Sequence, residues 1–252
     1  GCRFLYIANM FRAERPQAGR YREFEQIGLE IFGDSSALAD AELISLAQAI
    51  FQNYGLTETR LAINSIGCPV CREPYRGDLM AVLKNMATDL CEDCQNRLEK
   101  NPMRCLDCKK CSAKISPVAP VFKKCAECES HEETLEALLN AGGVVFTKDS
   151  SIVRGLDYYT RTVFEFSSPH LGSQNAICGG GRYDGLVELL GGAKTPATGL
   201  AIGVDRVIEA KAAAKIDRQA TLENLPSAFL VFAQPDAATM AYGLVWCFIA
   251  HD

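Results

Sequence analysis

No uninterrupted apolar run in this sequence reaches the roughly 20 residues that a membrane-spanning helix requires. We therefore expect no membrane partner, although 48% of the 252 residues are hydrophobic. The formal net charge is −5, so the molecule has no overall positive charge to attract nucleic acid, and any RNA contact must come from a local basic segment. The glycine–lysine motif of P-loop proteins is also absent. If the protein binds ATP, arginines on a sheet must hold the phosphates.

Cysteine, in contrast, is abundant, with twelve residues that occur mostly as Cys-x-x-Cys pairs. In an otherwise ordinary sequence this spacing indicates metal ligands or free thiols in a reducing cytoplasm rather than a secreted disulfide framework. Four pairs would suit two structural zinc sites with four cysteine ligands each. The candidate ligands are Cys68, Cys71, Cys91, Cys94, Cys105, Cys108, Cys125 and Cys128. Cys111 is left over, the sequence does not say which pairs share a metal, and buried free thiols are the alternative.

Residue patterns predict a β-rich domain that the cysteine-rich segment interrupts. Residues 3–13 and 22–32 are expected to form two strands joined by a loop, and residues 38–54 a helix. The predicted apolar face of this helix consists of Leu38, Leu43, Leu46, Ala47 and Ile50. A capping-box pattern at residues 130–133 predicts the start of a second helix.

The second predicted strand has two different faces. Strand alternation places one set of side chains together, namely Phe24, Gln26, Gly28 and Glu30. The opposite face carries Ile27, Leu29 and Ile31. Polar side chains that flank a glycine, over an apolar reverse side, fit the floor of a ligand site, but a solvated outer face would give the same alternation.

Three short stretches combine arginine with acidic, aromatic or glycine residues. Residues 11–20 read FRAERPQAGR, residues 154–159 read RGLDYY, and residues 198–206 read TGLAIGVDR. The first resembles motif 2 of class II aminoacyl-tRNA synthetases, the second resembles the histidine-specific signature of histidyl-tRNA synthetases, and the third resembles motif 3. Because the three stretches occur in the family's order, roughly residues 1–210 resemble a histidyl-tRNA synthetase.

This resemblance implies how ATP would be bound. Arg12 resembles the arginine that holds the α-phosphate, Arg206 the arginine that holds the γ-phosphate, and Glu14 the residue near the adenine amino group. Arg154 resembles the arginine between the substrate carboxylate and the α-phosphate, so Arg154 and Arg12 are the candidate catalytic residues. A fixed cation there lowers the repulsion between two anionic reactants. Mg²⁺ is expected with the phosphates, while a surface salt bridge is the ordinary alternative for any one of these arginines.

The resemblance also implies a histidine pocket. Its candidate residues are Gln26, Glu30, Arg154, Tyr158 and Tyr159. An imidazole needs partners at two ring nitrogens, which a carboxylate and a phenol can supply. An amino acid without these nitrogens would leave the pocket groups unpaired. Glycines 179–181 would let the substrate approach closely, although a tight turn would also explain them.

The implied fold is α+β, with a class II synthetase-type antiparallel sheet flanked by helices and an inserted small, helical, cysteine-rich domain. The resemblance also implies that this sequence is part of a longer protein, which would contain motif 1 and form a homodimer. The expected segments are a first part of the catalytic core (1–66), the cysteine-rich insertion (67–147), a second part of the core (148–215), a linker (216–227) and the start of a truncated anticodon-binding domain (228–252).

The implied function is ATP-dependent ligation of histidine to its tRNA through a histidyl-adenylate. The family's insertion reaches the tRNA acceptor stem, and a local excess of basic residues in this segment fits such a contact. These residues are Lys100, Arg104, Lys109, Lys110, Lys114, Lys123 and Lys124. A solvated face that offsets the charge of zinc thiolates is the alternative explanation.

Two other functions are open. The regulatory subunit of ATP phosphoribosyltransferase shares this core but only senses histidine, and Arg12, Arg206 and the presence of the insertion oppose that assignment. A zinc-dependent RNA-binding module centred on the cysteines is opposed by the motifs outside that segment. We expect residues 1–252 alone to have weak or undetectable turnover, because motif 1 and an upstream amino-acid-binding loop are missing from them.

Overall fold

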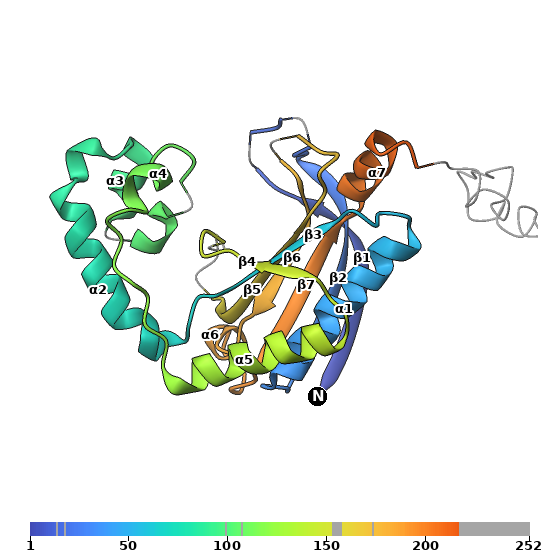
Figure 1. The fold of residues 1–252 in the computed structure, drawn as a ribbon, viewed down its shortest axis with the longest axis horizontal. Coiled ribbons are helices and arrows are strands. Elements are labelled where there is room, and N and C mark those ends of the chain that lie inside the picture. Colours follow the sequence, from blue (N-terminus) through green and yellow to red (C-terminus); the bar gives the residue numbers. More distant parts are fainter. Residues whose placement is uncertain are drawn as a thin grey trace, which may run out of the picture. The chain divides into compact units, whose positions relative to one another are not determined.

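The computed structural model describes residues 1–13, 15–17, 19–98, 100–106, 108–152, 158–172 and 174–216. Its centre is a seven-stranded sheet in the order β1-β2-β7-β6-β5-β3-β4 (Figure 1). Neighbouring strands are antiparallel, except that β3 and β4 run parallel. The expected α+β class, with helices flanking a largely antiparallel sheet, is confirmed.

The elements have the following bounds. The strands are β1 (Cys2–Phe11), β2 (Glu23–Phe32), β3 (Arg60–Ser65), β4 (Phe146–Lys148), β5 (Thr160–Ser167), β6 (Ala176–Arg182) and β7 (Ala197–Gly203). The helices are α1 (Ala37–Asn53), α2 (Pro69–Asn85), α3 (Glu92–Arg97), α4 (Ser112–Ile115), α5 (Ala126–Ala141), α6 (Leu186–Leu189) and α7 (Val204–Ala213), with 3-10 turns η1 (Ala87–Asp89) and η2 (Pro102–Cys105).

The first two strands form a long hairpin, as the sequence predicts. Their register runs from Cys2 opposite Phe32 to Phe11 opposite Glu23. Strand β2 also pairs with β7, so it lies inside the sheet, whereas β1 lies at the edge. The predicted apolar face of β2 is correct, because Leu29 is buried in the core beneath the sheet.

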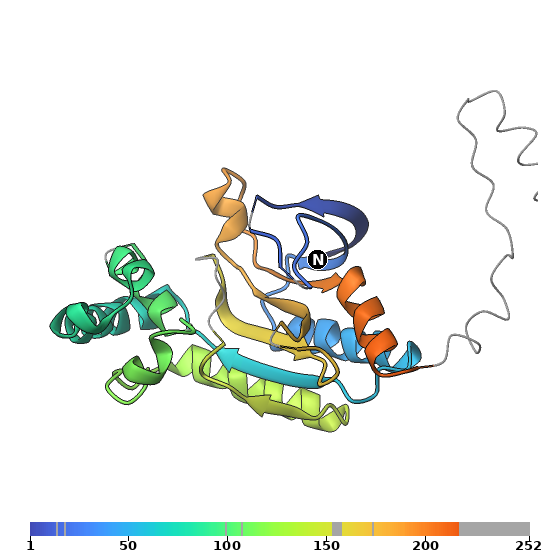
Figure 2. The ribbon, with the colours of Figure 1, turned by 90° about the horizontal axis from the view of Figure 1, so that it is seen from above.

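Helices α1 and α5 cover one face of the sheet (Figures 1 and 2). The core between these layers includes Phe51 of α1, Leu139 of α5 and Phe164 of β5. The predicted apolar face of α1 is wrong in part, since Leu38 is 58% and Leu46 43% exposed. Alanines occupy much of the buried side instead, and their small side chains let the helix lie close to the sheet.

A buried ion network ties both helices to the sheet. Arg182 of β6 is fully buried and donates to the two carboxylate oxygens of Asp40 on α1 over 2.8 and 3.3 Å. The same carboxylate lies 2.8 Å from Nε2 of His131 on α5. Burial alone would raise the pKa of Asp40, but hydrogen bonding by His131 and the charge of Arg182 hold this pKa below its ordinary value. The network therefore fixes α1 and α5 beneath β6.

The segment from α2 to α4 forms a second, smaller core. Leu79 and Leu83 of α2 pack there with Leu90 and Ile115. Figure 2 shows α2, α3 and α4 gathered to one side of the sheet rather than over it. A helical, cysteine-rich segment thus interrupts the sheet domain as expected, while its boundaries at residues 67 and 147 remain predictions.

The start of α5 differs from the prediction. The helix begins at Ala126 with Cys125 as its N-cap, four residues before the capping-box pattern at 130–133. Two acidic residues in the first turn, Glu127 and Glu129, favour this earlier start through the helix dipole. A Cys-x-x-Cys pair therefore stands at the N-terminus of α5.

The C-terminal predictions fall largely outside the described residues. The predicted linker (216–227) lies outside them except for Ile216, and the predicted start of a further domain (228–252) lies wholly outside. Among the helices of the described ranges, none has the length and apolar character to cross a membrane.

Candidate functional site

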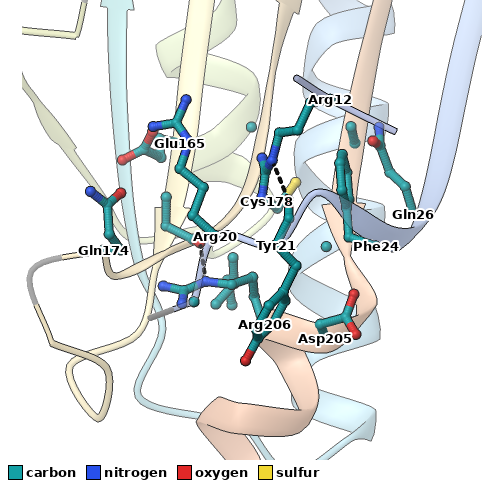
Figure 3. A pocket seen from close by; sticks show the side chains of 16 residues that line it. Arg12, Arg20, Tyr21, Phe24, Gln26, Glu165, Gln174, Cys178, Asp205 and Arg206 are labelled. Carbon is teal, nitrogen blue, oxygen red and sulfur yellow. Dashed lines mark hydrogen bonds between the residues drawn. The ribbon is translucent and has the colours of Figure 1, made fainter. Parts of the chain in front are cut away.

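The loop between β1 and β2 and the start of α7 line a cavity of about 350 Å³. Both arginines predicted to hold phosphates, Arg12 and Arg206, line it together with Gln26 of β2 (Figure 3). These residues meet because β2 pairs with β7, and α7 follows β7 directly. The fold thus joins the first and the third motif at one site.

Arg12 follows the last residue of β1 and is held by the other arm of the hairpin. Its backbone N–H donates to the carbonyl of Arg22 over 2.9 Å, and its Nε donates to the carbonyl of Tyr21 over 2.6 Å. The guanidinium carbon lies 4.3 Å from the centroid of the Phe24 ring. Stacking and hydrogen bonding together orient the planar guanidinium, which suits it to bind a phosphate in a defined geometry.

Arg206 lies in the first turn of α7. Its Nε donates to the carbonyl of Ala176 over 3.4 Å, and its Nη1 lies 3.0 Å from Oε2 of Glu209. Its Nη2 is buried and has no hydrogen-bond partner within the described part of the chain. A buried unpaired donor costs free energy that an anionic ligand would offset. Gly19 has a φ of 71°, and a Cβ there would lie 1.6 Å from Nη1 of Arg206, so glycine is needed where the loop meets this side chain.

Small residues form the floor beside this cavity. In the sheet register Gly28 lies opposite Ala201, Ala201 opposite Gly179, and Gly199 opposite Gly181. Residues directly opposite on neighbouring strands point to the same face of the sheet, so this floor shares its face with the polar side of β2. The glycine run is therefore part of β6 and not a tight turn. The side chain of Tyr6 lies over Gly28, where a Cβ would be 1.9 Å from the tyrosine Cζ, so the close approach of a ligand stays a prediction.

Glu30 lies at the other end of this floor and accepts a hydrogen bond from the hydroxyl of Tyr183. Burial raises the pKa of Glu30, and the hydrogen bond from Tyr183 partly offsets this effect. Burial and the neighbouring Glu30 also raise the pKa of Tyr183. A Cβ at Gly199 would lie 1.6 Å from Oε2 of Glu30, so the glycine leaves room for the carboxylate.

The two tyrosines of the second motif lie beside this carboxylate. The rings of Tyr158 and Tyr159 have centroids 4.7 Å apart. Each ring meets Tyr183 edge to face, at 5.8 and 6.3 Å between centroids. Tyr183 therefore connects the tyrosine pair to Glu30 and completes an aromatic wall around it.

Six of the eight residues predicted to bind ATP or histidine lie on one face of the sheet in these two groups, namely Arg12, Arg206, Gln26, Glu30, Tyr158 and Tyr159. The remaining two, Arg154 and Glu14, lie outside the described residues. Sequence reasoning missed Tyr183, although it follows the glycine run within GGGRYDG at 179–185. An aromatic residue just beyond a glycine-lined strand was the available signal.

The paired cysteines form two groups, each with four sulfur atoms within 4.8 Å of one another. We call them the neck site and the distal site. The neck site consists of Cys68, Cys71, Cys125 and Cys128, and the distal site consists of Cys91, Cys94, Cys108 and Cys111.

The sulfur separations fit a tetrahedral zinc ion. Four sulfurs bound at about 2.3 Å in tetrahedral directions would lie about 3.8 Å apart. In the neck site Sγ of Cys68 lies 3.8 Å from that of Cys125, and Sγ of Cys71 lies 3.6 Å from that of Cys128. The backbone N–H of Cys125 also donates to Sγ of Cys71 over 3.3 Å. Four thiols at these separations are a donor set that suits zinc.

The structure corrects one predicted ligand, because Cys111 and not Cys105 belongs to the distal site. Cys105 is buried in the second core, and its thiol donates to the carbonyl of Cys94 over 3.6 Å. Sγ of Cys111 accepts the backbone N–H of Cys91 over 3.2 Å. Since Cys105, Cys108 and Cys111 are spaced three apart, the Cys-x-x-Cys pattern fits either pair, and the positions of the sulfur atoms in the fold select between them.

One thiol in each site is shifted toward the thiolate form. Hydrogen bonding with Cys94 lowers the pKa of Cys91 to about 7. Burial opposes ionisation of Cys68, but hydrogen bonding with Cys71 lowers its pKa to about 7. Cys68 and Cys91 are the N-caps of α2 and α3, where the helix dipole also favours negative charge.

The predicted basic segment is partly engaged within the protein. Lys124 pairs with Glu132 of α5, and Lys114 donates to the carbonyl of Asp89 over 3.3 Å. The other predicted basic residues remain candidates for contact with a phosphate backbone.

Comparisons with known proteins agree with these observations. The family model for histidyl-tRNA synthetase matches residues 2–72 and 75–207. The histidine–tRNA ligase of Elusimicrobium minutum is 51% identical over 217 residues, which cover 86% of this chain and 52% of that protein. The histidine–tRNA ligase of Nitratiruptor sp. is 50% identical over 211 residues, covering 82% and 51%. The chain therefore spans about half the length of the curated relatives it matches.

Solved structures give the same picture of the fold. The apo histidyl-tRNA synthetase of S. aureus is similar with a TM-score of 0.71 and 32% identity, over 96% of this chain and 58% of that chain. A structure from Bacillus halodurans described as an ATP phosphoribosyltransferase regulatory subunit/histidyl-tRNA synthetase has a TM-score of 0.55 and 27% identity, over 82% and 58%.

Proposed function

Because this chain belongs to the histidyl-tRNA synthetase family, we propose that it forms the central part of the catalytic domain of a histidine–tRNA ligase. The longer protein joins histidine to ATP, releases pyrophosphate, and passes the histidyl group from the adenylate to the 3′ end of its tRNA. Its ligands are histidine, ATP with Mg²⁺, and tRNA.

One observation carries this proposal: the polar face of β2 leads from the two arginines to the half-buried carboxylate of Glu30. Gln26, which lines the arginine cavity, is four residues from Glu30, so about 14 Å separate them along the strand at about 3.4 Å per residue. An amino acid joined to a nucleotide can bridge this span.

The arginines divide the work on ATP. Arg12 binds the α-phosphate, Arg206 uses its unpaired Nη2 for the γ-phosphate, and Glu14 contacts the adenine. Arg154 stabilises the charge that gathers between the histidine carboxylate and the α-phosphate during attack. No protein base is required, because the attacking carboxylate is ionised at neutral pH.

The histidine side chain binds among the tyrosines. Glu30 accepts the N–H of one imidazole nitrogen, and the hydroxyl of Tyr159 meets the other, while Gln26 and Tyr158 line the pocket. Tyr183 holds the Glu30 carboxylate in place through their hydrogen bond. This arrangement disfavours amino acids that would leave the carboxylate unpaired.

Each cysteine site binds one structural zinc ion. The sulfur separations in the neck site, at 3.6 and 3.8 Å, support this assignment, as does the Sγ distance of 3.7 Å between Cys91 and Cys108 in the distal site. Zinc would supply folding energy to the small second core, which contains few large apolar side chains.

Two macromolecular partners belong to the proposal. The basic residues between Lys100 and Lys123 contact the acceptor stem of the tRNA. The full-length protein forms a homodimer. The edge strand β1 supports an apolar contact of this kind, since Phe4, Leu5 and Ile7 are each more than half exposed.

Histidine-dependent ATP–pyrophosphate exchange by the full-length protein tests the proposal. Arg154→Ala should lower the exchange rate about a hundredfold or more, the scale of losing one transition-state contact. Arg3→Ala is the control, because Arg3 forms an exposed ion pair with Glu42 of α1. Exchange that does not depend on histidine, or that Arg154→Ala leaves unchanged, would refute the assignment.

The two other functions have less support. The relatives with about 50% sequence identity are named histidine–tRNA ligases, whereas the solved structure described partly as a regulatory subunit has 27% sequence identity to this chain. A regulatory subunit would bind histidine without exchange, so the same assay distinguishes the two. The family match runs through the cysteine segment and continues on both sides of it, which opposes an independent zinc-dependent RNA-binding module.

A further inference from the structure

The neck site connects two hydrophobic cores. Two of its cysteines begin α2, which packs in the second core through Leu79, and the other two begin α5, which packs beneath the sheet through Leu139. The contact between His131 and Asp40 also anchors α5 to the sheet domain. The distal site, in contrast, takes all four cysteines from the chain between α2 and α4. Of the two sites, only the neck site therefore takes its ligands from helices that pack in different cores.

The α2 half of the neck site is connected by a hydrogen bond to the segment that contains Tyr158 and Tyr159. Arg72 directly follows Cys71, and its Nη1 donates to the backbone carbonyl of Tyr159 over 2.8 Å. Arg72 is partly buried, and a hydrogen bond from a charged donor is stronger than one between neutral groups. The first turn of α2 thus fixes the backbone that carries a predicted histidine-binding side chain.

A second connection runs through the backbone of Arg161. This residue has a φ of 53°, in the left-handed region that residues other than glycine adopt only where their surroundings enforce it. Its N–H donates to the carbonyl of Gly67 over 2.9 Å, and its carbonyl accepts from Ile66 over 2.8 Å. Gly67 directly precedes Cys68, so the backbone immediately before the neck site holds Arg161 of β5 in this strained conformation.

The α5 half of the neck site also contacts Arg161, in this case through an ion pair. Glu127, between Cys125 and Cys128, has its Oε2 3.3 Å from Nη2 of Arg161. Because the Glu127 side chain is 81% exposed, this ion pair adds little stability by itself. It does place both halves of the neck site beside the residues that follow Tyr159.

We propose that metal at the neck site positions the Tyr158–Tyr159 segment and thereby the histidine pocket, whereas metal at the distal site serves only the fold of the second core. This inference rests on the proposed function, since it assumes that the tyrosines bind histidine and that the cysteines bind zinc. Without the neck metal the first turns of α2 and α5 separate, and Arg72 and Gly67 no longer hold Tyr159 and Arg161 in place. Arg12, which follows β1, and Arg206 of α7 lie in segments that contain no neck cysteine, so ATP binding is spared.

Paired serine variants of the full-length protein test this difference between the sites. Cys68→Ser/Cys125→Ser removes one ligand from each half of the neck site, and Cys91→Ser/Cys108→Ser is the matched change at the distal site. Each variant should lose about one equivalent of zinc by elemental analysis. In calorimetric titrations the neck variant should bind histidine about tenfold more weakly, while the distal variant stays within about twofold of wild type. Both should keep ATP affinity within about twofold.

Arg72→Ala tests the route without removing a ligand. It should keep both zinc equivalents and the thermal unfolding midpoint of the second core, yet weaken histidine binding several-fold. Arg76→Ala, one turn further along α2, is its control and should bind histidine as wild type does. Arg76 donates to the carbonyl of Lys100 over 3.4 Å.

The outcomes separate this inference from its premises. Unchanged histidine affinity in the neck variant, despite the loss of one zinc, would overturn the coupling and leave the zinc assignment intact. Unchanged affinity in Arg72→Ala would overturn the proposed route. Wild-type protein that contains no zinc would overturn the neck site as a metal site, and wild-type protein that binds no histidine would overturn the proposed function itself.

Discussion

Replacement of Arg182 by leucine would test the network that fixes α1 and α5 beneath the sheet. The guanidinium is fully buried and makes two hydrogen bonds to Asp40, and it also donates to the backbone carbonyls of Asp34 and Ser36 over 2.9 and 2.7 Å. Arg182→Leu leaves a buried carboxylate without its charged donor and two carbonyl groups without their partner. Breaking a buried ion pair from one side costs about 3–5 kcal/mol. We expect a loss of about 4 kcal/mol in the free energy of unfolding.

Two control variants separate this loss from a general effect of removing arginine. Arg3→Leu breaks an ion pair with Glu42 whose side chains are 58% and 40% exposed, and it should hardly change stability. The double variant Arg182→Leu/Asp40→Leu removes the carboxylate as well. It should recover only part of the stability lost in the single variant, because the fully buried carboxylate of Asp40 is gone, while Asp184 still lacks its ion pair with Arg182.

Urea unfolding followed by circular dichroism at constant zinc concentration measures these differences. With a slope of about 2–3 kcal/mol per molar urea, the midpoint of Arg182→Leu should fall by about 1.3–2 M. The lowered pKa of Asp40 means that its ionised form stabilises the folded protein above the unfolded-state pKa, and this contribution disappears as the pH falls through the folded-state pKa. The stability difference between wild type and variant should therefore shrink on acidification. A loss no larger than that of Arg3→Leu, or one independent of pH, would refute the reasoning.

Two further predictions concern the histidine pocket. Glu30→Gln and Tyr159→Phe should each weaken histidine binding by about 1–3 kcal/mol and leave ATP binding intact in calorimetric titrations; equal loss of both ligands would indicate a folding role. Because burial raises the pKa of Glu30, its carboxylate should protonate, and histidine affinity fall, at a higher pH than for an exposed glutamate. Tyr183→Phe should move that transition further upward, because the hydrogen bond that opposes the rise is lost. The linkage sign is opposite for stability: the raised pKa of Glu30 makes the folded state less stable as pH rises from the unfolded-state pKa through the folded-state one. Titration of histidine affinity and of urea midpoints against pH would check both signs.

The amino-acid sequence by itself determined the features that depend on neighbouring residues. Alternation identified the two faces of β2, with Leu29 toward the core and Glu30 toward the site. The motifs around Arg12 and Arg206 indicated the family, and the Cys-x-x-Cys spacing indicated two groups of metal ligands. These features follow from the periodicity of strands and from short spacings, which hold wherever the segment lies in the fold.

Tertiary structure decided the features that depend on what packs against a segment. Three cysteines spaced three apart allowed two distal ligand pairs, and the fold brought the sulfur of Cys111, not that of Cys105, to the other three ligands. The helical pattern of α1 placed Leu38 and Leu46 on its apolar face, yet the sheet receives the alanine side because small residues allow a closer approach. The sequence could not place Tyr183 against Glu30, 153 residues away along the chain, since that contact depends on the pairing of β2 with β7 and of β7 with β6. Contacts across a sheet follow from strand order and register, and these are set by the packing of the whole domain rather than by any local pattern.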